Sequence, residues 1–120
     1  MTTMIVEDRQ ALPEWFSYDD EYLFFAANEI TEFGPIRFLP AGGQLTVREW
    51  IQRTLGFDCV PICYDGQMDE HVAWVFVDGR QKIVRFPGDS DRLEVFQEYE
   101  SFWAVLDYAV RRMKEAYLDD

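Results

Sequence analysis

Histidine, cysteine and basic residues are scarce in this chain of 120 residues. It holds one histidine, two cysteines and 11 Lys and Arg residues against 23 Asp and Glu residues, so its net charge is −12. Nucleic acids and anionic membranes select Lys and Arg, and the charge therefore disfavours both as direct ligands. It permits a basic protein partner, because a field of one sign steers association with the opposite sign. The alternative interpretation is that the acidity only keeps an aromatic-rich domain soluble.

Long apolar runs are also absent. No run approaches the roughly 20 residues of a membrane span, and the N-terminus lacks the basic and then apolar layout of a signal peptide. We therefore expect a cytoplasmic protein with no membrane partner. Hydrophobic residues make up 48% of the chain and aromatic residues 17%, which excludes disorder. A chain of this length predicts a single domain over residues 1–120 that buries roughly 65–70% of its unfolded surface.

The two cysteines, Cys59 and Cys63, fall in one strand expected over residues 57–64. Residues i and i+4 of a strand share a face but lie about 13 Å apart, too far for a disulfide. A zinc site would need more ligands than these and the single histidine, His71. We expect buried reduced thiols, no metal and no other cofactor. Pro61, inside the same strand, indicates a sheet edge or a bulge.

A buried hairpin is the central prediction. Val72 to Val77 is a run of six apolar residues rich in β-branched and aromatic types, too short and unperiodic for a helix. Asp78-Gly79 follows at once, and Gly tolerates the positive φ that a tight turn needs. A second β-rich run from Ile83 to Phe86 completes a hairpin over about residues 72–86.

Two helices are expected. Thr46 and Glu49 have the spacing of a capping box, and apolar residues at helical intervals follow, which predicts a short helix over about residues 46–55. Ser101 is the expected N-cap of a C-terminal helix over about residues 101–118. The apolar stripe of that helix consists of Phe102, Val105, Leu106, Ala109, Val110, Met113, Ala116 and Tyr117.

The N-terminal part reads mainly as strands and loops. The aromatic run Tyr22–Ala27 and the run Ile36–Leu39 favour strands, separated by a turn at Gly34-Pro35. Residues 1–10 are polar and are expected to fray, apart from Ile5 and Val6. Local hairpins without a βαβ repeat predict an α+β fold with a mostly antiparallel sheet.

No catalytic motif is recognisable. Nucleophilic catalysis needs a nucleophile, a base and an orienting group. A Cys63–His71 pair across neighbouring strands is conceivable, but a strand-end histidine with satisfied hydrogen bonds is the expected reading of His71. The acidic loop from Asp65 lacks the ligand order of a calcium loop, and Gly42-Gly43 lacks the Lys of a phosphate loop. We expect a protein that is not an enzyme.

The remaining candidates are surfaces. Two acidic segments carry aromatic neighbours, and aromatics rimmed by charge are typical of specific interfaces. The alternative is that the aromatics point inward and the acids are solvated turns. The predicted partner-binding residues are Tyr18, Asp19, Asp20, Glu21, Tyr64, Asp65, Asp69 and Glu70.

Several short motifs follow one another over roughly residues 11 to 110. They are Leu12-Pro13-Glu14-Trp15-Phe16, the segment Phe33 to Pro40, Val60-Pro61-Ile62 leading into Asp65-Gly66, the apolar hairpin, and Ser101-Phe102. Their order resembles the SUKH superfamily of Smi1/Knr4-like proteins, which includes many bacterial toxin-immunity proteins, although that family continues with a helix where this chain has the run Tyr22–Ala27. The resemblance implies an α+β binding protein that neutralises a toxin by covering its surface, and it implies no catalytic residues.

Three functions remain open at this point. The first is an immunity or inhibitor protein that masks a basic surface of a toxin or nuclease-like partner. The second is a phage or mobile-element inhibitor that mimics nucleic acid with ordered carboxylates and acts against a host defence complex. The third is a small enzyme or metal-binding domain, for which a deep pocket around His71 would argue.

Overall fold

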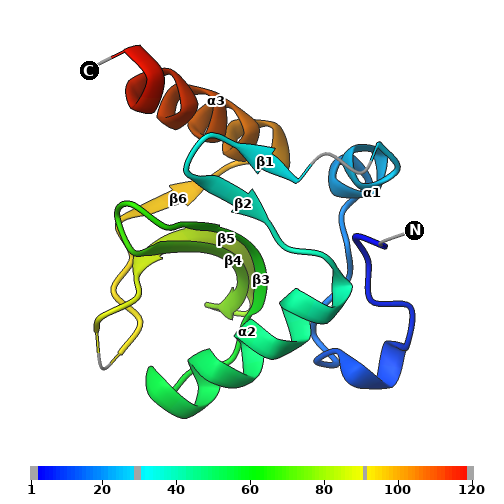
Figure 1. Ribbon diagram of the computed structural model, residues 1–120. Helices are drawn as coiled ribbons and strands as arrows, with labels where there is room; N and C mark the ends of the chain where they lie inside the picture. The colour runs from blue at the N-terminus through cyan, green and yellow to red at the C-terminus, as the bar shows by residue number, and fades with distance from the viewer. Residues whose placement is uncertain (1–2, 29–30, 91, 119–120) are drawn as a thin grey trace.

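The computed structural model describes residues 3–28, 31–90 and 92–118. Six strands form one antiparallel sheet in the order β1-β2-β3-β4-β5-β6 (Figure 1). The strands are β1 (Glu32–Phe33), β2 (Ile36–Phe38), β3 (Val60–Asp65), β4 (Glu70–Val77), β5 (Arg80–Pro87) and β6 (Gln97–Tyr99). A 3-10 helix η1 (Arg9–Ala11) and three α-helices, α1 (Asp20–Ala26), α2 (Ala41–Thr54) and α3 (Phe102–Leu118), complete these elements. The predicted α+β class with an antiparallel sheet is confirmed.

The predicted hairpin is formed by β4 and β5. The two strands pair along their whole length, from Glu70 opposite Pro87 to Val77 opposite Arg80. Their turn residues Asp78 and Gly79 have φ of 56° and 78°. This left-handed pair matches the right-handed twist of the strands, as in other two-residue hairpins. Each strand has eight residues, so the hairpin is the longest pairing among the described strands.

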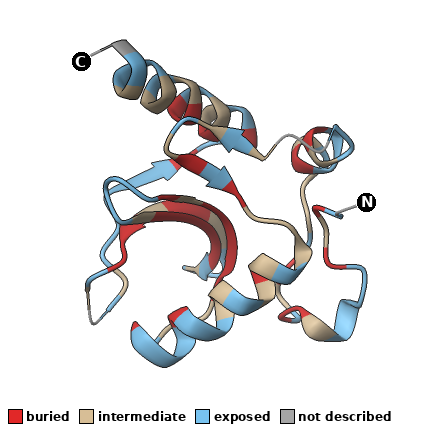
Figure 2. Ribbon diagram, in the orientation of Figure 1, coloured by how far each residue is buried: buried red, intermediate tan, exposed pale blue. Residues whose placement is uncertain are grey.

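The central strands of the sheet are buried on both faces, because helices cover each face, whereas β1 and β6 at its borders are largely exposed (Figures 1 and 2). Side chains alternate along β4: Val72 and Trp74 pack into a large core beneath α1 and α3. Ala73 and Val75 pack into a smaller core beneath α2. Two covered faces explain why the run is apolar at consecutive positions instead of alternating.

A bulge in β3 overturns one expectation about the cysteines. The register with β4 shifts between Pro61 and Cys63, as the proline predicted. The extra residue reverses the alternation, so Cys59 packs in the core beneath α2 and Cys63 in the core beneath α1 and α3. The prediction that they share a face is therefore wrong. Both thiols are buried and free, and burial raises the pKa of each.

Helix α2 begins five residues earlier than the capping-box pattern predicted. Pro40 occupies the N-cap position, and Gly42 and Gly43 lie in the first turn instead of in a loop. A Cβ on Gly43 would stand 3.4 Å from Pro40 Cδ, an ordinary van der Waals contact, so the packing there does not require glycine. Thr46 therefore lies inside the helix and caps nothing.

Tyr22–Ala27 was predicted as a strand, and that prediction is wrong: Asp20–Ala26 is helix α1. Asp19 is the N-cap, and its carboxylate accepts the Tyr22 N–H at 2.7 Å. Asp20 and Glu21 in the first turn suit the positive end of the helix dipole. These capping interactions, together with the burial of Tyr22 and Phe25 one turn apart, override the β preference of the aromatic run.

The expected fraying of residues 1–10 is wrong at Met4, which is buried, whereas Val6 is buried as expected. The Met4 carbonyl accepts the Tyr22 hydroxyl at 2.6 Å and the Gln44 amide at 2.8 Å. The Val6 N–H donates to the Tyr18 hydroxyl at 2.8 Å. The buried amide of Gln44 thus ties the N-terminal segment to the start of α2.

Helix α3 confirms the C-terminal prediction. The Ala104 N–H donates to the Ser101 hydroxyl at 3.3 Å, as expected of an N-cap. Phe102, Val105 and Ala109 are buried against the sheet. Trp103, one position off the apolar stripe, is exposed. The helix therefore presents an aromatic side chain to solvent near its first turn.

Candidate functional site

The first acidic segment is largely bound into the fold. The Tyr18 hydroxyl donates to Gln44 Oε1 at 2.5 Å, and burial raises the pKa of Tyr18. Asp19 caps α1 with one oxygen and accepts the Trp74 indole N–H at 3.2 Å with the other. Glu21 accepts the Phe102 N–H at the start of α3. Only Asp20 of the four predicted residues here is exposed.

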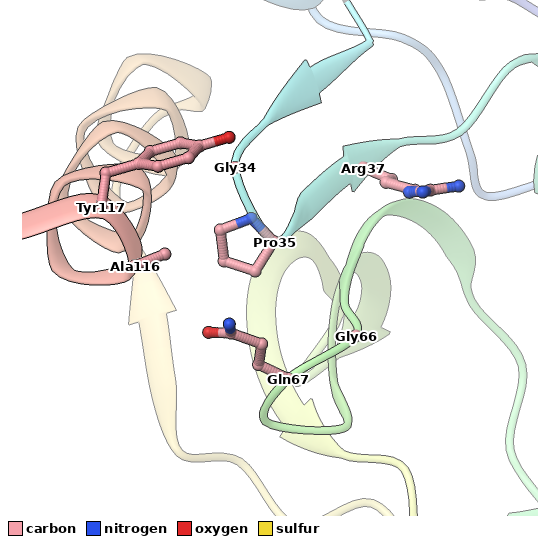
Figure 3. A pocket seen from close by; sticks show the side chains of 7 residues that line it. All are labelled: Gly34, Pro35, Arg37, Gly66, Gln67, Ala116 and Tyr117. Carbon is pink, nitrogen blue, oxygen red and sulfur yellow. The ribbon is translucent and has the colours of Figure 1, made fainter. Parts of the chain in front are cut away.

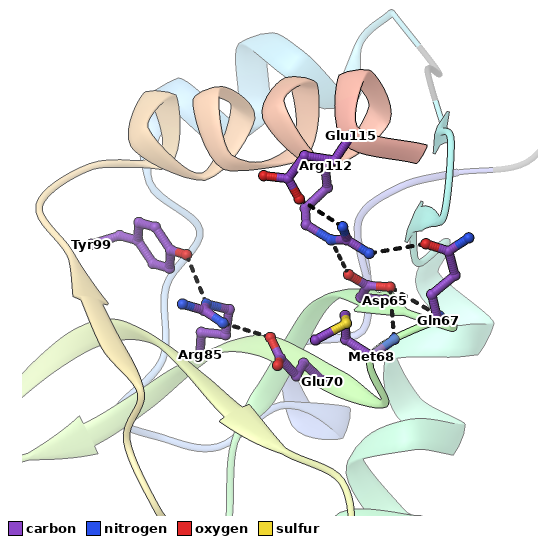
Figure 4. A network of polar contacts seen from close by, with 8 residues as sticks. All are labelled: Asp65, Gln67, Met68, Glu70, Arg85, Tyr99, Arg112 and Glu115. Atoms are coloured by element: carbon purple, nitrogen blue, oxygen red, sulfur yellow. Dashed lines mark hydrogen bonds and ion pairs between the residues drawn. The ribbon is translucent and has the colours of Figure 1, made fainter. Parts of the chain in front are cut away.

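Two acids of the second segment form ion pairs beneath α3 (Figure 4). Asp65, whose side chain is fully buried, accepts Arg112 Nε at 2.6 Å. Glu70 is paired with Arg85 at 2.5 Å, and Arg85 also donates to the Tyr99 hydroxyl. The hydrogen bond that Arg112 donates to Asp65 is the main reason that the pKa of Arg112 is raised. The carboxylates of Asp65 and Glu70 are therefore satisfied inside the protein.

Tyr64 and Asp69 lie together on the other side of the sheet. The Tyr64 hydroxyl donates to Asp69 Oδ1 at 2.8 Å, and this hydrogen bond is the main reason that the pKa of Tyr64 is raised. Tyr64 pairs with His71, which lies on the α2 face, whereas Asp19 bonds Trp74 on the α1 and α3 face. The structure thus brings Tyr64 and Asp69 together and places the first acidic segment on the opposite face.

A groove opens between α2 and the sheet at this point. Its volume is about 360 Å³, within the range of small ligand pockets. Helix α2 supplies one wall, and β3, β4 and two adjoining loops supply the rest. We call it the α2 groove, and it is lined by Leu39, Thr46, Val47, Trp50, Tyr64, Asp69 and His71.

His71 lines the α2 groove with a buried side chain that has no hydrogen-bond partner among the described residues. Its side chain is only 4% exposed, and this lack of a partner applies to both ring nitrogens. Burial lowers the pKa of His71 to about 4, against a smaller opposing effect of Asp69, so the ring is neutral at pH 7. The expectation of a satisfied strand-end histidine is wrong. The Cys63–His71 pair is excluded as well, because Cys63 pairs with Val72 and faces the opposite core.

Aromatic rings surround the His71 imidazole. Ring-centroid distances are 4.7 Å to Tyr64, 5.5 Å to Phe86 and 5.9 Å to Trp50. Trp50 comes from α2 and is 37% exposed, so it borders the groove without being held in the core. The groove thus combines an aromatic wall, a neutral imidazole and the carboxylate of Asp69.

A second exposed aromatic surface lies where α1 meets α3. Phe24 is 69% exposed and Trp103 is 42% exposed, and their ring centroids are 6.2 Å apart. Asp20 lies one turn before Phe24, and Asp107 lies one turn after Trp103, so each acid shares a helix face with its aromatic. We call this surface the α1–α3 patch, and it consists of Leu23, Phe24 and Trp103 with the exposed acids Asp20, Glu100 and Asp107.

Another hollow of about 360 Å³ lies between the C-terminal end of α3 and the turns β1–β2 and β3–β4 (Figure 3). Arg37, Gln67 and Tyr117 contribute its polar groups. Arg37 extends away from Tyr117 in Figure 3, so these side chains do not converge on one point. The hollow is a weaker candidate than the α2 groove for this reason.

The sequence predicted Tyr64 and Asp69 of the α2 groove and Asp20 of the α1–α3 patch, but not the other residues of the two surfaces. His71 was expected to have satisfied hydrogen bonds. Trp103 could have been found, because it falls off the apolar stripe of α3. Phe24 was missed because the run Tyr22–Ala27 was predicted as a strand.

Within residues 3–28, 31–90 and 92–118, no three His, Cys, Asp or Glu side chains are grouped as metal ligands would be. In the same ranges, no helix combines the length and the apolar character that a bilayer crossing requires. Comparison of the chain with protein-family models, curated proteins and solved structures finds no match. The function must therefore be argued from the chain's own residues.

Proposed function

We propose that this chain is a small acidic binding protein that masks a basic surface of a protein partner, as an immunity or inhibitor protein does. The observation that carries the proposal is the α1–α3 patch. Phe24 and Trp103 remain exposed although most large aromatics of the chain are packed in its cores. Exposed aromatics next to one another are typical of the anchor residues of an interface.

Charge defines the kind of partner. The patch carries Asp20, Glu100 and Asp107, none of which forms an ion pair within the described residues. The chain as a whole has a net charge of −12. A basic protein surface complements this field, which speeds association and disfavours neutral or acidic competitors. A nuclease or another toxin that binds polyanions has such a surface.

A non-enzymatic role belongs to the same proposal. Catalysis by Cys63 would require a thiolate, yet burial raises the pKa of this thiol. Cys63 also packs in the core beneath α1 and α3, away from His71. A cytoplasmic location is part of the proposal too. The SUKH resemblance stays a prediction; the correction of Tyr22–Ala27 to a helix removes one difference from that family's pattern.

The proposal is tested by charge reversal on the patch. The chain is co-expressed with the products of the flanking genes, and a copurifying basic protein is measured by calorimetry at two salt concentrations. Replacing Asp20, Glu100 and Asp107 with Lys should weaken binding by at least 100-fold, because attraction becomes repulsion. The affinity of the original chain should fall as the salt concentration rises.

A matched control reverses three exposed acids elsewhere. Glu7, Glu14 and Glu32 are exposed and lie outside the patch, and replacing them with Lys gives the same net charge change. This variant should bind within a few-fold of the original chain. Equal losses from the two variants would show that net charge acts without a specific patch and would contradict the proposal. Competition by duplex DNA would favour the nucleic-acid mimic as the form of inhibition.

A further inference from the structure

The α2 groove has the architecture of an aromatic cage. Trp50 from α2 and Tyr64 from β3 both contact the His71 ring, with centroid distances of 5.9 Å and 4.7 Å to it. Trp50 and Tyr64 both line the hollow, so a ligand inside it would meet the rings of both. Such cages bind organic cations, because the face of an aromatic ring carries negative charge density.

The charges of the lining agree with a cationic ligand. Asp69 is the charged residue of the groove, and it already accepts one hydrogen bond from Tyr64 through Oδ1. A neutral His71 adds no positive charge, and no Lys or Arg of the described chain lines the groove. Arg37, the neighbour of Tyr64 on β2, borders the other hollow instead. A cation therefore enters without repulsion from the groove's own lining.

A ligand that donates a hydrogen bond would satisfy the unpartnered imidazole of His71. A buried polar group without a partner costs free energy, and such groups in native proteins call for an explanation. Neutral imidazole keeps one nitrogen lone pair, which accepts a hydrogen bond. The His71 nitrogens are covered at present, so a ligand reaches this lone pair by displacing the aromatic contacts above it. Trp50, which is partly exposed, is the contact best placed to move.

We propose that the α2 groove binds the side chain of an arginine presented by a protein or peptide. A guanidinium is planar, stacks on aromatic faces and is weakly hydrated, so it suits a groove lined by Trp50 and Tyr64 better than an ammonium. It carries five donors, which can serve both Asp69 and the His71 lone pair. The groove faces away from the α1–α3 patch, so this site stands independently of the function proposed for that patch.

The test uses a short peptide with one arginine, Ac-Gly-Arg-Gly-NH₂, and the same peptide with citrulline, its neutral isostere. The chain has a single histidine, so the imidazole NMR signals belong to His71 without further assignment. Arginine peptide should shift these signals with a millimolar Kd, which is the scale of a single side chain. Citrulline peptide should bind at least 10-fold more weakly, because it lacks the charge that Asp69 and the rings attract.

Two tryptophans provide a matched pair of variants. Trp50→Leu should weaken arginine binding at least 10-fold, whereas Trp103→Leu, at a similarly exposed tryptophan on the opposite face, should leave it unchanged. Asp69→Asn should also weaken binding and keeps a residue that tolerates the positive φ of 52°. Citrulline binding equal to arginine binding, or full affinity in Trp50→Leu, would overturn the proposal. Either result would leave the α1–α3 patch experiment unaffected, since that experiment measures a different face.

Discussion

Replacing Trp74 with alanine should lower the free energy of unfolding by about 4 kcal/mol. Trp74 is the largest of the fully buried side chains and is 1% exposed. Its ring centroid lies 4.9 Å from that of Tyr22 and 5.0 Å from that of Phe16. Truncation removes these contacts and leaves a cavity in the larger core, which rigid neighbouring strands cannot close. Urea denaturation followed by circular dichroism measures the change.

Two variants separate the causes of this loss. Trp74→Phe keeps a ring but removes the indole N–H that bonds Asp19, so it should cost less than the alanine variant. Trp103→Ala, at an exposed position, should cost at most about 1 kcal/mol. A Trp74→Ala loss no larger than that of Trp103→Ala would contradict the packing of β4 against α1 described above.

Acid should destabilise the chain through His71, by up to about 3 kcal/mol between pH 6.5 and pH 4. In the unfolded chain the imidazole titrates near its ordinary value of 6.5, whereas burial lowers the folded-state pKa to about 4. Between these values the unfolded state binds a proton that the folded state does not. The contribution is therefore fully present above pH 6.5 and is lost as the pH falls toward 4. Asp69 opposes the shift, while the contacting rings of Tyr64, Trp50 and Phe86 carry no charge in this range.

His71→Phe isolates this effect, since both chains carry the same carboxylates. The variant should lose less stability than the original chain from pH 7 to pH 4, by about 3 kcal/mol. At pH 7 it should be at least as stable, because it replaces unpartnered nitrogens with carbon in an aromatic environment. Parallel stability curves for the two chains, or an NMR titration of His71 near pH 6.5, would refute the prediction.

The hairpin was predictable because its signals are local, whereas the short strands β1 and β6 were not predicted. The apolar run, Asp78-Gly79 and the second run specify the hairpin within the 15 residues from Val72 to Phe86. Pro61 marked the bulge, but its consequence for Cys63 was missed. The face of every later residue in a strand depends on whether one extra residue is inserted, and composition does not determine that.

The helix errors have different causes. In α1 the capping residue Asp19 was visible, but the aromatic run after it outweighed the cap in the prediction. In α2 the Gly42-Gly43 pair was read as a loop, because glycine disfavours a helix interior. The buried hydrogen bonds of Gln44, however, join the first turn of α2 to Met4 and Tyr22, which are distant in sequence. Tertiary contacts therefore decided what propensity alone could not.

The candidate surfaces were harder to predict than the fold. Asp65 and Glu70 were chosen because they are acidic, yet their partners Arg112 and Arg85 lie 47 and 15 residues away along the chain. The α2 groove forms because α2 packs against the strands that contain Tyr64 and His71. No local sequence pattern predicts this packing. Residue type indicated charge, and only the packing revealed which charges remain at the surface.

The lengths of the outermost strands have a consequence for self-association. At the two lateral borders of the sheet stand β1, with two residues, and β6, with three. Each border offers few unpaired amide and carbonyl groups, and short borders of this kind discourage another copy from adding a strand. The part of β5 that β6 does not cover bears the exposed Arg80, whose charge repels the same residue of a second molecule. Even at high concentration the chain should resist growth into cross-β fibrils.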